Sequence, residues 1–515
     1  MFIKEIFAVG TQVINKIEKR KQPLYYWLFS WVAIVMARMY IEDYSAGRLA
    51  VRGFFDIRNQ LHEFLFYIVV FLGVVFILSF FSDEQFSKVL RSCVTFSPIL
   101  LVAPIIDLTI TGGKGLYMSY VYNFDIQGFL IRFLTLGGTW EGGGATPGMK
   151  IEVIFILVFI FIYLFVKTKK KFLSVIGTLY AYCGLVLIGM YPLLLEKFIS
   201  LFPGADREVA KELDIKIFVL FVFALALILF FRYRKNDFKS LCQQLRFTRV
   251  IYYVVLSSMG FVLSHYINGS TKEAPIQVID SLILIIILVL SSVFSMMIND
   301  REDVALDAIS NVKRLLPSGK IKEQNYFVYG IVAFLFAIIL SSTIHLEIVY
   351  LVILGNLIFF IYSAPPFSLK KIFLVSKLAL AANSVIVMTL GYFLNQRECS
   401  AFLPNDVMVP LFITVFLVGH VIDVKDYEGD RKVGRKTLST LLGLRATRYV
   451  ITVMFIVSFI GVTVLLKKNV YVIYSGLLGL LTGLMLFKKP YQEYLVFFFI
   501  IISLVWFSFL YFFIN

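Results

Sequence analysis

Long runs of apolar residues recur along the whole of this 515-residue chain, and they constrain its fold more than any other feature. Each run of about 18–25 residues is long enough to cross the hydrocarbon core of a bilayer as a helix. Hydrophobic residues make up 59% of the sequence, which excludes an ordinary water-soluble globular protein. We therefore expect an all-α polytopic protein, integral to a membrane and crossing it many times.

The apolar runs form two series on either side of a polar and basic stretch, residues 233–248. About six runs precede this stretch and about nine follow it. We therefore predict an N-terminal transmembrane module of unknown function in residues 1–232, a basic cytoplasmic linker at 233–248 and a C-terminal transmembrane domain in residues 249–515.

Basic residues gather in alternate loops, such as 167–171 and 232–235, whereas the loops 266–278 and 395–406 carry few of them. The positive-inside rule then places the N-terminus in the cytoplasm and the C-terminus outside. We expect the membrane to be the inner membrane of a prokaryotic cell. Loop anchoring also accounts for the net charge of +16, so we expect no nucleic-acid partner. The four cysteines show neither metal-binding nor disulfide spacing.

Two aspartate-rich stretches, residues 299–307 and 423–430, stand at the predicted cytoplasmic ends of apolar runs. Their polar residues recur at intervals of three and four, which places carboxylates on one face of a helix. The residues on these faces are Asn299, Asp303 and Asp307 in the first stretch, and Asp426 and Asp430, with Asp423 about a turn earlier, in the second. Stacked carboxylates repel one another, and such an oxygen-only set suits Mg2+, especially Mg2+ shared with a phosphate.

Lysines and arginines follow both aspartate-rich stretches and end a third predicted cytoplasmic loop. Acids that hold Mg2+ among such bases form a cradle for a diphosphate, and the neighbouring helices would form a groove for a long apolar tail. Two other interpretations of the residues remain open. The stretches are solvated helix ends with incidental acids, or they are the ion sites of an ion-coupled membrane transporter.

Three segments resemble, in order, the signatures of the UbiA superfamily of intramembrane prenyltransferases. Asn299-x-x-x-Asp303-x-x-x-Asp307, with the following Arg314-Leu-Leu-Pro-Ser-Gly, is similar to the first signature. Residues 362–371, Tyr-Ser-Ala-Pro-Pro-Phe-Ser-Leu-Lys-Lys, resemble the Tyr-Ser-x-Pro-Pro-x-x-Leu-Lys loop, and residues 423–438 resemble the second aspartate signature. The sequence departs from the usual pattern at three positions: Leu315 for Pro, Ser368 for a base and Ser439 for Pro.

The resemblance implies a nine-helix UbiA-like bundle in residues 249–515 and an activity. A prenyl group would pass from a polyprenyl diphosphate to an unidentified aromatic or hydroxyl acceptor, with Mg2+ as cofactor and release of diphosphate on the cytoplasmic side. The residues implied as catalytic are Asp303, Asp307, Asp426 and Asp430, which with Asn299 would also hold the metal. The residues implied to contact the diphosphate are Arg314, Lys370, Lys371 and Arg431. Supporting roles fall to Asp423, Lys425 and Tyr362, with Asp423 holding Lys370, Lys425 or a water.

Alternatives remain within and beyond this family. A terpene cyclase of the same superfamily needs the same aspartates, whereas a transporter would place its acids near the bilayer midplane. His420, near the second stretch, either tunes the acidic site or packs between helices.

The resemblance does not reach residues 1–232, where we expect a module that handles a partner or a substrate. There Asp107, Asp125, Glu141 and Glu152, with Trp140, either line a polar pocket or lie in water-exposed loops.

Overall fold

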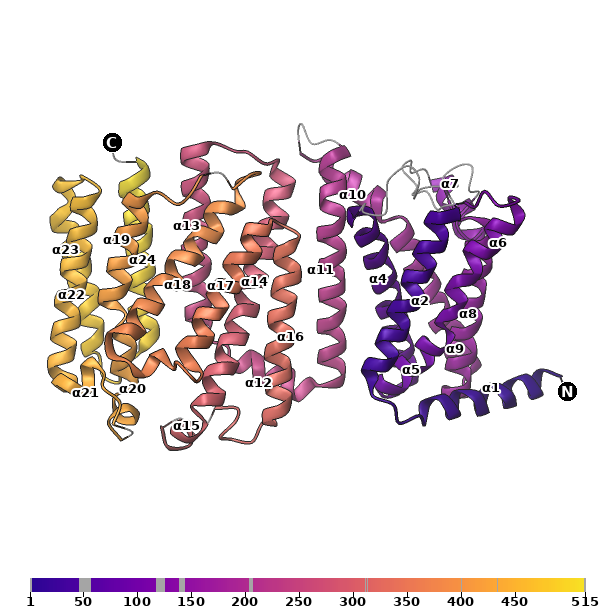
Figure 1. The fold of residues 1–515 in the computed structure, drawn as a ribbon, viewed down its shortest axis with the longest axis horizontal. Helices are drawn as coiled ribbons and strands as arrows, with labels where there is room; N and C mark the ends of the chain where they lie inside the picture. The colour runs from indigo at the N-terminus through magenta and orange to yellow at the C-terminus, as the bar shows by residue number, and fades with distance from the viewer. Residues whose placement is uncertain are drawn as a thin grey trace. The chain divides into compact units, whose positions relative to one another are not determined.

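The computed structural model describes residues 2–45, 57–116, 126–138, 144–202, 207–310, 312, 314–399, 401–432 and 434–513. These residues form helices and no β-strand, so the predicted all-α fold is confirmed (Figure 1). Within them, 15 helices are long and apolar enough to cross a membrane. The chain divides into two compact units, Met1–Lys235 and Asn236–Asn515, each described here by itself.

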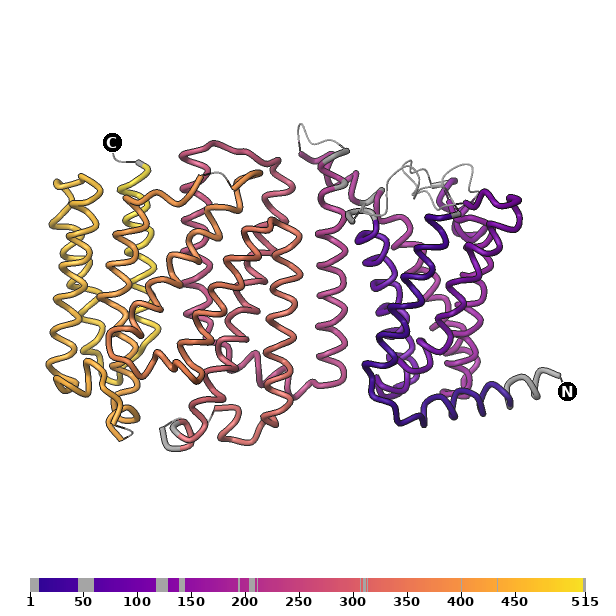
Figure 2. The backbone as a smooth tube through the Cα atoms, viewed as in Figure 1, coloured from indigo at the N-terminus to yellow at the C-terminus, as the bar shows by residue number. Residues whose placement is uncertain are grey.

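The N-terminal unit is a bundle of apolar helices with one helix, α1, lying across an end of it (Figure 2). Its helices are α1 (Phe2–Glu18), α2 (Leu24–Ser45), α4 (Ile57–Ser82), α5 (Phe86–Phe96), η1 (Ser97–Leu101), α6 (Val102–Ile110), α7 (Ile126–Leu134), α8 (Pro147–Thr168), α9 (Lys171–Gly189), α10 (Tyr191–Ile199) and α11 (Arg207–Tyr233). Helix α7 has nine residues, which is too short to span a bilayer. Helices α5, η1 and α6 follow one another without a gap and together make one candidate span.

Two acids of the glycine-rich region in the N-terminal unit are buried rather than exposed to water in loops. Asp107 and Glu152 are 2% and 7% exposed. The Asp107 carboxylate accepts hydrogen bonds from the Thr146 hydroxyl at 2.5 Å and the Gly148 amide at 2.7 Å, so it fixes the start of α8. The expectation of water-exposed loops is therefore wrong for these two acids. Asp125, Trp140 and Glu141 lie outside the described residues.

The C-terminal unit is a second bundle, with the short helices α12, α15, α20 and α21 at one end (Figure 1). Its helices are α12 (Lys235–Gln244), α13 (Phe247–Asn268), α14 (Ala274–Glu302), α15 (Val304–Ser310), α16 (Glu323–Ser342), α17 (Leu346–Ser363), η3 (Leu369–Lys371), α18 (Phe373–Leu394), α19 (Asn405–Val418), α20 (Val421–Lys432), α21 (Leu438–Leu442), α22 (Leu444–Leu465), η4 (Asn469–Tyr471), α23 (Val472–Leu484), η5 (Met485–Phe487) and α24 (Glu493–Phe513). Most of the stretch predicted to be a linker forms α12. Asp237 of this helix accepts a 2.6 Å hydrogen bond from Tyr329 of α16.

Glycines bring α13 and α18 into direct backbone contact. A Cβ atom added to Gly391 would lie 1.7 Å from the Ser257 carbonyl oxygen, and one on Gly260 would lie 2.0 Å from that of Met388. Small residues allow this close approach between membrane helices, where packing rather than water exclusion drives association. The pair forms a fixed wall of the unit.

The two aspartate-rich stretches lie at the same end of the C-terminal unit. Helix α14 ends at Glu302 and α15 resumes the chain, while α20 follows α19 after a break at Gly419 and His420. Helices α15 and α20 contact each other, and η3 packs against α17 and α18. Helix α24 ends at the opposite end of the unit (Figure 2).

Candidate active site

The first stretch keeps its helical spacing across the junction between α14 and α15. The Asp303 amide donates to the Asn299 carbonyl at 3.0 Å, and the Asp307 amide donates to the Asp303 carbonyl at 2.8 Å. The three predicted side chains therefore remain one turn apart although the helix breaks between them. Asp307 is buried, and Asp303 is 13% exposed at its side chain.

The second stretch folds back on itself through a left-handed turn. Gly434 has φ +69°, a value that favours glycine. After it, the Arg435 amide donates to the Asp430 carbonyl at 2.9 Å. The Arg435 guanidinium donates to the Asp430 carboxylate at 3.2 Å and lies 3.7 Å from the Asp303 carboxylate. One cation thus links the two stretches, although nothing in the spacing of the sequence distinguishes it from its basic neighbours.

The Tyr-Ser-Ala-Pro-Pro loop delivers a buried lysine to the first stretch. The Lys370 ammonium lies 2.9 Å from the Asp303 carboxylate and 3.4 Å from the Asn299 side-chain oxygen. Burial lowers the pKa of Lys370, and the charge of Asp303 opposes this effect. Lys371 is exposed and is not among the residues that line the cavity beside Lys370. Of the two adjacent lysines predicted to bind diphosphate, only Lys370 therefore reaches the site.

Arg314 joins the same cluster from the segment after α15. It pairs with Asp307 and lies 3.4 Å from Asp300. Asp300 is 1% exposed and also accepts a 3.1 Å hydrogen bond from the Tyr326 hydroxyl. Arg246 lies 3.6 Å from the same carboxylate, and burial, helped by neighbouring arginines, lowers the pKa of Arg246. Asp300 therefore anchors two arginines, a role that its sequence position did not indicate.

Asp423 does not hold either of the lysines predicted for it. Its carboxylate accepts a 2.6 Å hydrogen bond from Lys377 of α18, and the His420 ring nitrogen lies 3.3 Å away. Lys370 is engaged as described above, and Lys425 instead pairs with Glu493 at 2.8 Å. Neither predicted lysine is its partner, because Lys377 reaches Asp423 from another helix. His420 is buried, so it both packs between helices and orients this carboxylate.

A cavity of about 640 Å³ begins at these charged groups and continues between the helices. Its charged end is formed by Asn299, Asp303, Asp307, Arg314, Lys370, Asp426, Asp430 and Arg435, with Tyr362 and Lys425 beside them. Arg431, predicted to bind diphosphate, is exposed and does not line it.

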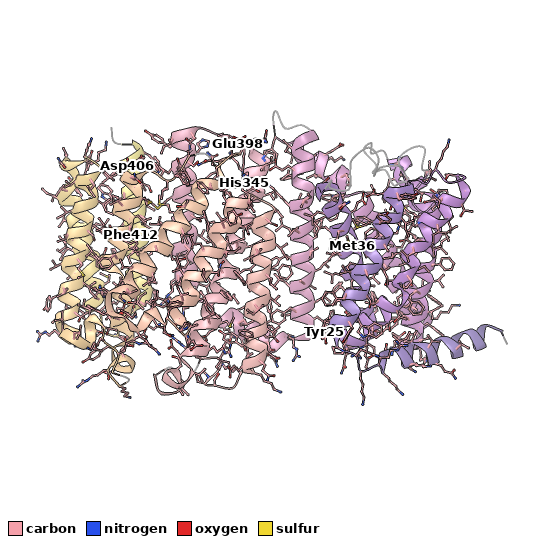
Figure 3. All side chains as sticks on the ribbon, in the orientation of Figure 1. Tyr25, Met36, His345, Glu398, Asp406 and Phe412 are labelled. Carbon is pink, nitrogen blue, oxygen red and sulfur yellow. The ribbon has the colours of Figure 1, made fainter. Side chains whose placement is uncertain are left out.

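The rest of the cavity is mainly apolar. Lining residues recur along α19, from Asp406 to Val418, and continue on α20 to Asp426. The 14 residues of α19 rise about 20 Å, which is a large part of the roughly 30 Å thickness of the bilayer hydrocarbon core. Asp406 lies at the far end of the unit from α20 (Figure 3). The cavity therefore offers a long apolar tail a path through most of the membrane.

Comparison with known proteins identifies this part of the chain. Residues 270–494 match the model of the UbiA prenyltransferase family. These residues form a UbiA prenyltransferase family domain. The UbiA domain holds both aspartate-rich stretches and the loop between them.

Named relatives are similar at a low level of identity. The chain is 26% identical over 219 residues to digeranylgeranylglyceryl phosphate synthase of Sulfurisphaera tokodaii, covering 41% of this chain and 75% of the relative. It is 28% identical over 166 residues to chloroplastic chlorophyll synthase of Arabidopsis thaliana, covering 30% of this chain and 42% of the relative. A solved structure of a UbiA homolog from Archaeoglobus fulgidus bound to GPP and Mg2+ covers 52% of this chain and 98% of that one, at 17% identity and a TM-score of 0.42.

The side chains of the UbiA domain fit a hard divalent cation by their chemistry. All five predicted metal ligands offer oxygen atoms, as Mg2+ requires. Across the described ranges, no three acidic, histidine or cysteine side chains are already drawn together around one point. Instead Lys370, Arg314 and Arg435 hold the carboxylates. The donor set suits Mg2+, and the bases occupy its oxygen atoms in the present arrangement.

Proposed function

We propose that the C-terminal unit transfers a prenyl group from a polyprenyl diphosphate to an aromatic or hydroxyl acceptor inside the membrane, with Mg2+ as cofactor. One observation carries this proposal: two acidic stretches and three bases meet at the end of a mainly apolar cavity of about 640 Å³ that continues along α19. The UbiA family match supports the reaction class. The charged end suits a diphosphate, and the apolar length suits its tail.

The metal ligands and the bases at the charged end of the cavity would together promote cleavage of the allylic C–O bond. Bound Mg2+, held by Asn299 and the aspartates, would supply positive charge to the diphosphate. Lys370, Arg314 and Arg435 are placed to neutralise the charge that the leaving diphosphate gains with the bonding electron pair. Their partial burial strengthens these interactions and excludes water.

The apolar walls of the cavity then favour reaction of the prenyl group with the acceptor over reaction with water. The allylic carbon becomes electron-poor as the C–O bond breaks, and water would capture it if present. Phe455 and Phe459 of α22 and Phe507 of α24 are among the groups that line the cavity, and their rings offer water no strong hydrogen-bond partner. The acceptor forms the new C–C or C–O bond and loses one proton, so the products are the prenylated acceptor, diphosphate and a proton.

We infer the orientation of the site from charge. Exposed Lys371, Arg431, Lys432 and Lys436 surround the charged end of the unit, as expected for a cytoplasmic face. Helix α24 ends at the other face, which agrees with a C-terminus outside.

Incubation of the purified full chain in lipid with a polyprenyl diphosphate and Mg2+ tests the proposal. Released diphosphate and extracted lipid products are measured together. Asp303→Asn and Asp426→Asn should each abolish diphosphate release, whereas Glu323→Gln, which alters an exposed acid paired with Arg301, should not.

Two outcomes would redirect the proposal. Diphosphate release that survives both aspartate substitutions would refute the assigned chemistry. A lipid product without any acceptor moiety would assign the domain to the terpene cyclases, which need the same aspartates.

A further inference from the structure

The N-terminal unit contains a buried carboxylate without adequate partners. Glu152 lies in the second turn of α8, inside a segment long and apolar enough to cross a membrane, and is 7% exposed. Its Oε2 atom is buried, and no donor in the described part of the chain hydrogen bonds to it. An ionised carboxylate in such a place is costly, because neither water nor donors replace its hydration.

The cation beside Glu152 lies closer to another acid. Arg38 of α2 is 1% exposed and lies 3.0 Å from the Glu42 carboxylate, but 3.8 Å from that of Glu152. The longer distance exceeds that of a hydrogen bond. The Arg38 Nε atom has no acceptor among the described residues. Arg38 and Glu152 therefore face each other across a gap, each with an unused polar atom.

Two of the other described groups that face Glu152 add negative charge, and the third is uncharged. They are Glu42 of α2, Asp107 of α6 and the neutral hydroxyl of Tyr67 on α4. Asp107 already accepts two hydrogen bonds, from the Thr146 hydroxyl and the Gly148 amide. Among the described residues, one guanidinium thus faces three carboxyl groups. Neutralising Glu152 removes the acid with the poorest contacts.

A second buried acid in the same unit has the hydrogen-bond donors that Glu152 lacks. Glu18 of α1 has the same exposure, 7%. It accepts a 3.0 Å hydrogen bond from the Tyr163 hydroxyl and pairs with the Lys167 ammonium. A buried carboxylate with such donors can stay ionised. Burial alone therefore does not set Glu152 apart; the lack of donors does.

We propose that Glu152 is a proton-binding site of the N-terminal unit, protonated in the arrangement described here. Deprotonation breaks its O–H bond, passes the proton to water and leaves a carboxylate that draws the Arg38 guanidinium across the gap. Because Arg38 lies on α2 and Glu152 on α8, proton release is linked to a change in the packing of these two helices. A proton needs no cavity, and the guanidinium disfavours a metal cation at the same place.

Infrared difference spectroscopy of the full chain in lipid tests this site. A protonated carboxylic acid has a C=O stretch separate from that of a carboxylate, and the band shifts in D2O. Glu152→Gln should remove such a band at neutral pH, and alkaline titration should remove it from the unsubstituted chain. Glu18→Gln should leave it unchanged, because Glu18 already has the Tyr163 hydroxyl and the Lys167 ammonium as donors. Identical spectra of the unsubstituted chain and Glu152→Gln at neutral pH would overturn the proposal.

Thermal unfolding gives a second, independent measurement. Glutamine resembles a protonated glutamate in shape and charge, so Glu152→Gln should unfold at the same temperature as the unsubstituted chain at neutral pH. A large fall in the unfolding temperature, with no infrared band lost, would mean that Glu152 is an ionised partner of Arg38 and would also overturn the proposal.

Discussion

Arg435 offers the sharpest test of how the charged end of the cavity works. In the structure its guanidinium occupies the space between Asp430, at 3.2 Å, and Asp303, at 3.7 Å, and its side chain is 17% exposed. These are the carboxylates assigned to Mg2+. The metal and the guanidinium would therefore compete for the same oxygen atoms. We expect Arg435→Gln to bind Mg2+ more tightly and to bind the diphosphate more weakly.

The size of the effect follows from the two contacts. A hydrogen bond to a charged group contributes about 1.5–3 kcal/mol, and the longer contact to Asp303 adds little because the side chain is partly hydrated. Loss of the guanidinium should thus destabilise the metal-free chain by about 2 kcal/mol. Without the guanidinium, Mg2+ would not have to displace it from the carboxylates, so the free energy of Mg2+ binding would become more favourable by the same amount. That change corresponds to a Mg2+ dissociation constant lowered by roughly 30-fold.

Thermal unfolding of the full chain across a Mg2+ titration measures both quantities. Without Mg2+, Arg435→Gln should unfold at a lower temperature than the unsubstituted chain, and saturating Mg2+ should narrow the difference. Arg435→Lys keeps the charge and should lie between the two. A folded Arg435→Gln variant with unchanged Mg2+ affinity would refute the reasoning, because the guanidinium would then not compete for the metal ligands.

Three further predictions concern packing, the paired lysines and the metal. Gly391→Ala should lower the unfolding temperature sharply because its Cβ would overlap the Ser257 carbonyl, whereas Gly461→Ala, in open space, should raise it slightly. Lys370→Gln should lower kcat/KM for diphosphate release by about 10²–10³-fold, the usual cost of losing one placed donor. Lys371→Gln, at an exposed position, should leave kcat/KM nearly unchanged. Chelation of divalent cations should stop diphosphate release, and added Mg2+ should restore it.

Local spacing was enough to predict one face of the site. The intervals between Asn299, Asp303 and Asp307 predict a shared helical face, and backbone hydrogen bonds preserve that face through the break after α14. Apolar runs likewise predict helices directly, because a segment inside a bilayer must satisfy its own backbone. Both inferences depend only on residues close together in the chain.

Contacts between distant elements could not be predicted in this way. Asp300 follows Asn299 directly, but on a helix it points about 100° away and meets Arg246, just before α13, and Tyr326 of α16. Arg435 reaches Asp303 only because Gly434 reverses the chain. Lys377 finds Asp423 because α18 packs against α19 and its neighbours.

One signal in the N-terminal unit was available in the sequence and was missed. Thr146-Pro147 is a typical helix start, with a capping hydroxyl followed by proline at the first helical position. A carboxylate such as Asp107 is well placed when it accepts from the first amides of a helix. That pattern predicts the start of α8, whereas the contact with Asp107, 39 residues earlier in the chain, is one between distant elements.

The backbone contact between α13 and α18 divides the cavity into a fixed side and an adjustable side. Helices whose backbones touch at glycines cannot come closer, and moving apart would break that contact. The facing wall is built from side chains, among them Phe459 of α22 and Phe507 of α24, whose rings lie 5.3 Å apart. Substitutions that suit the enzyme to tails of a different width should therefore accumulate on α22 and α24, while α13 and α18 keep their glycines.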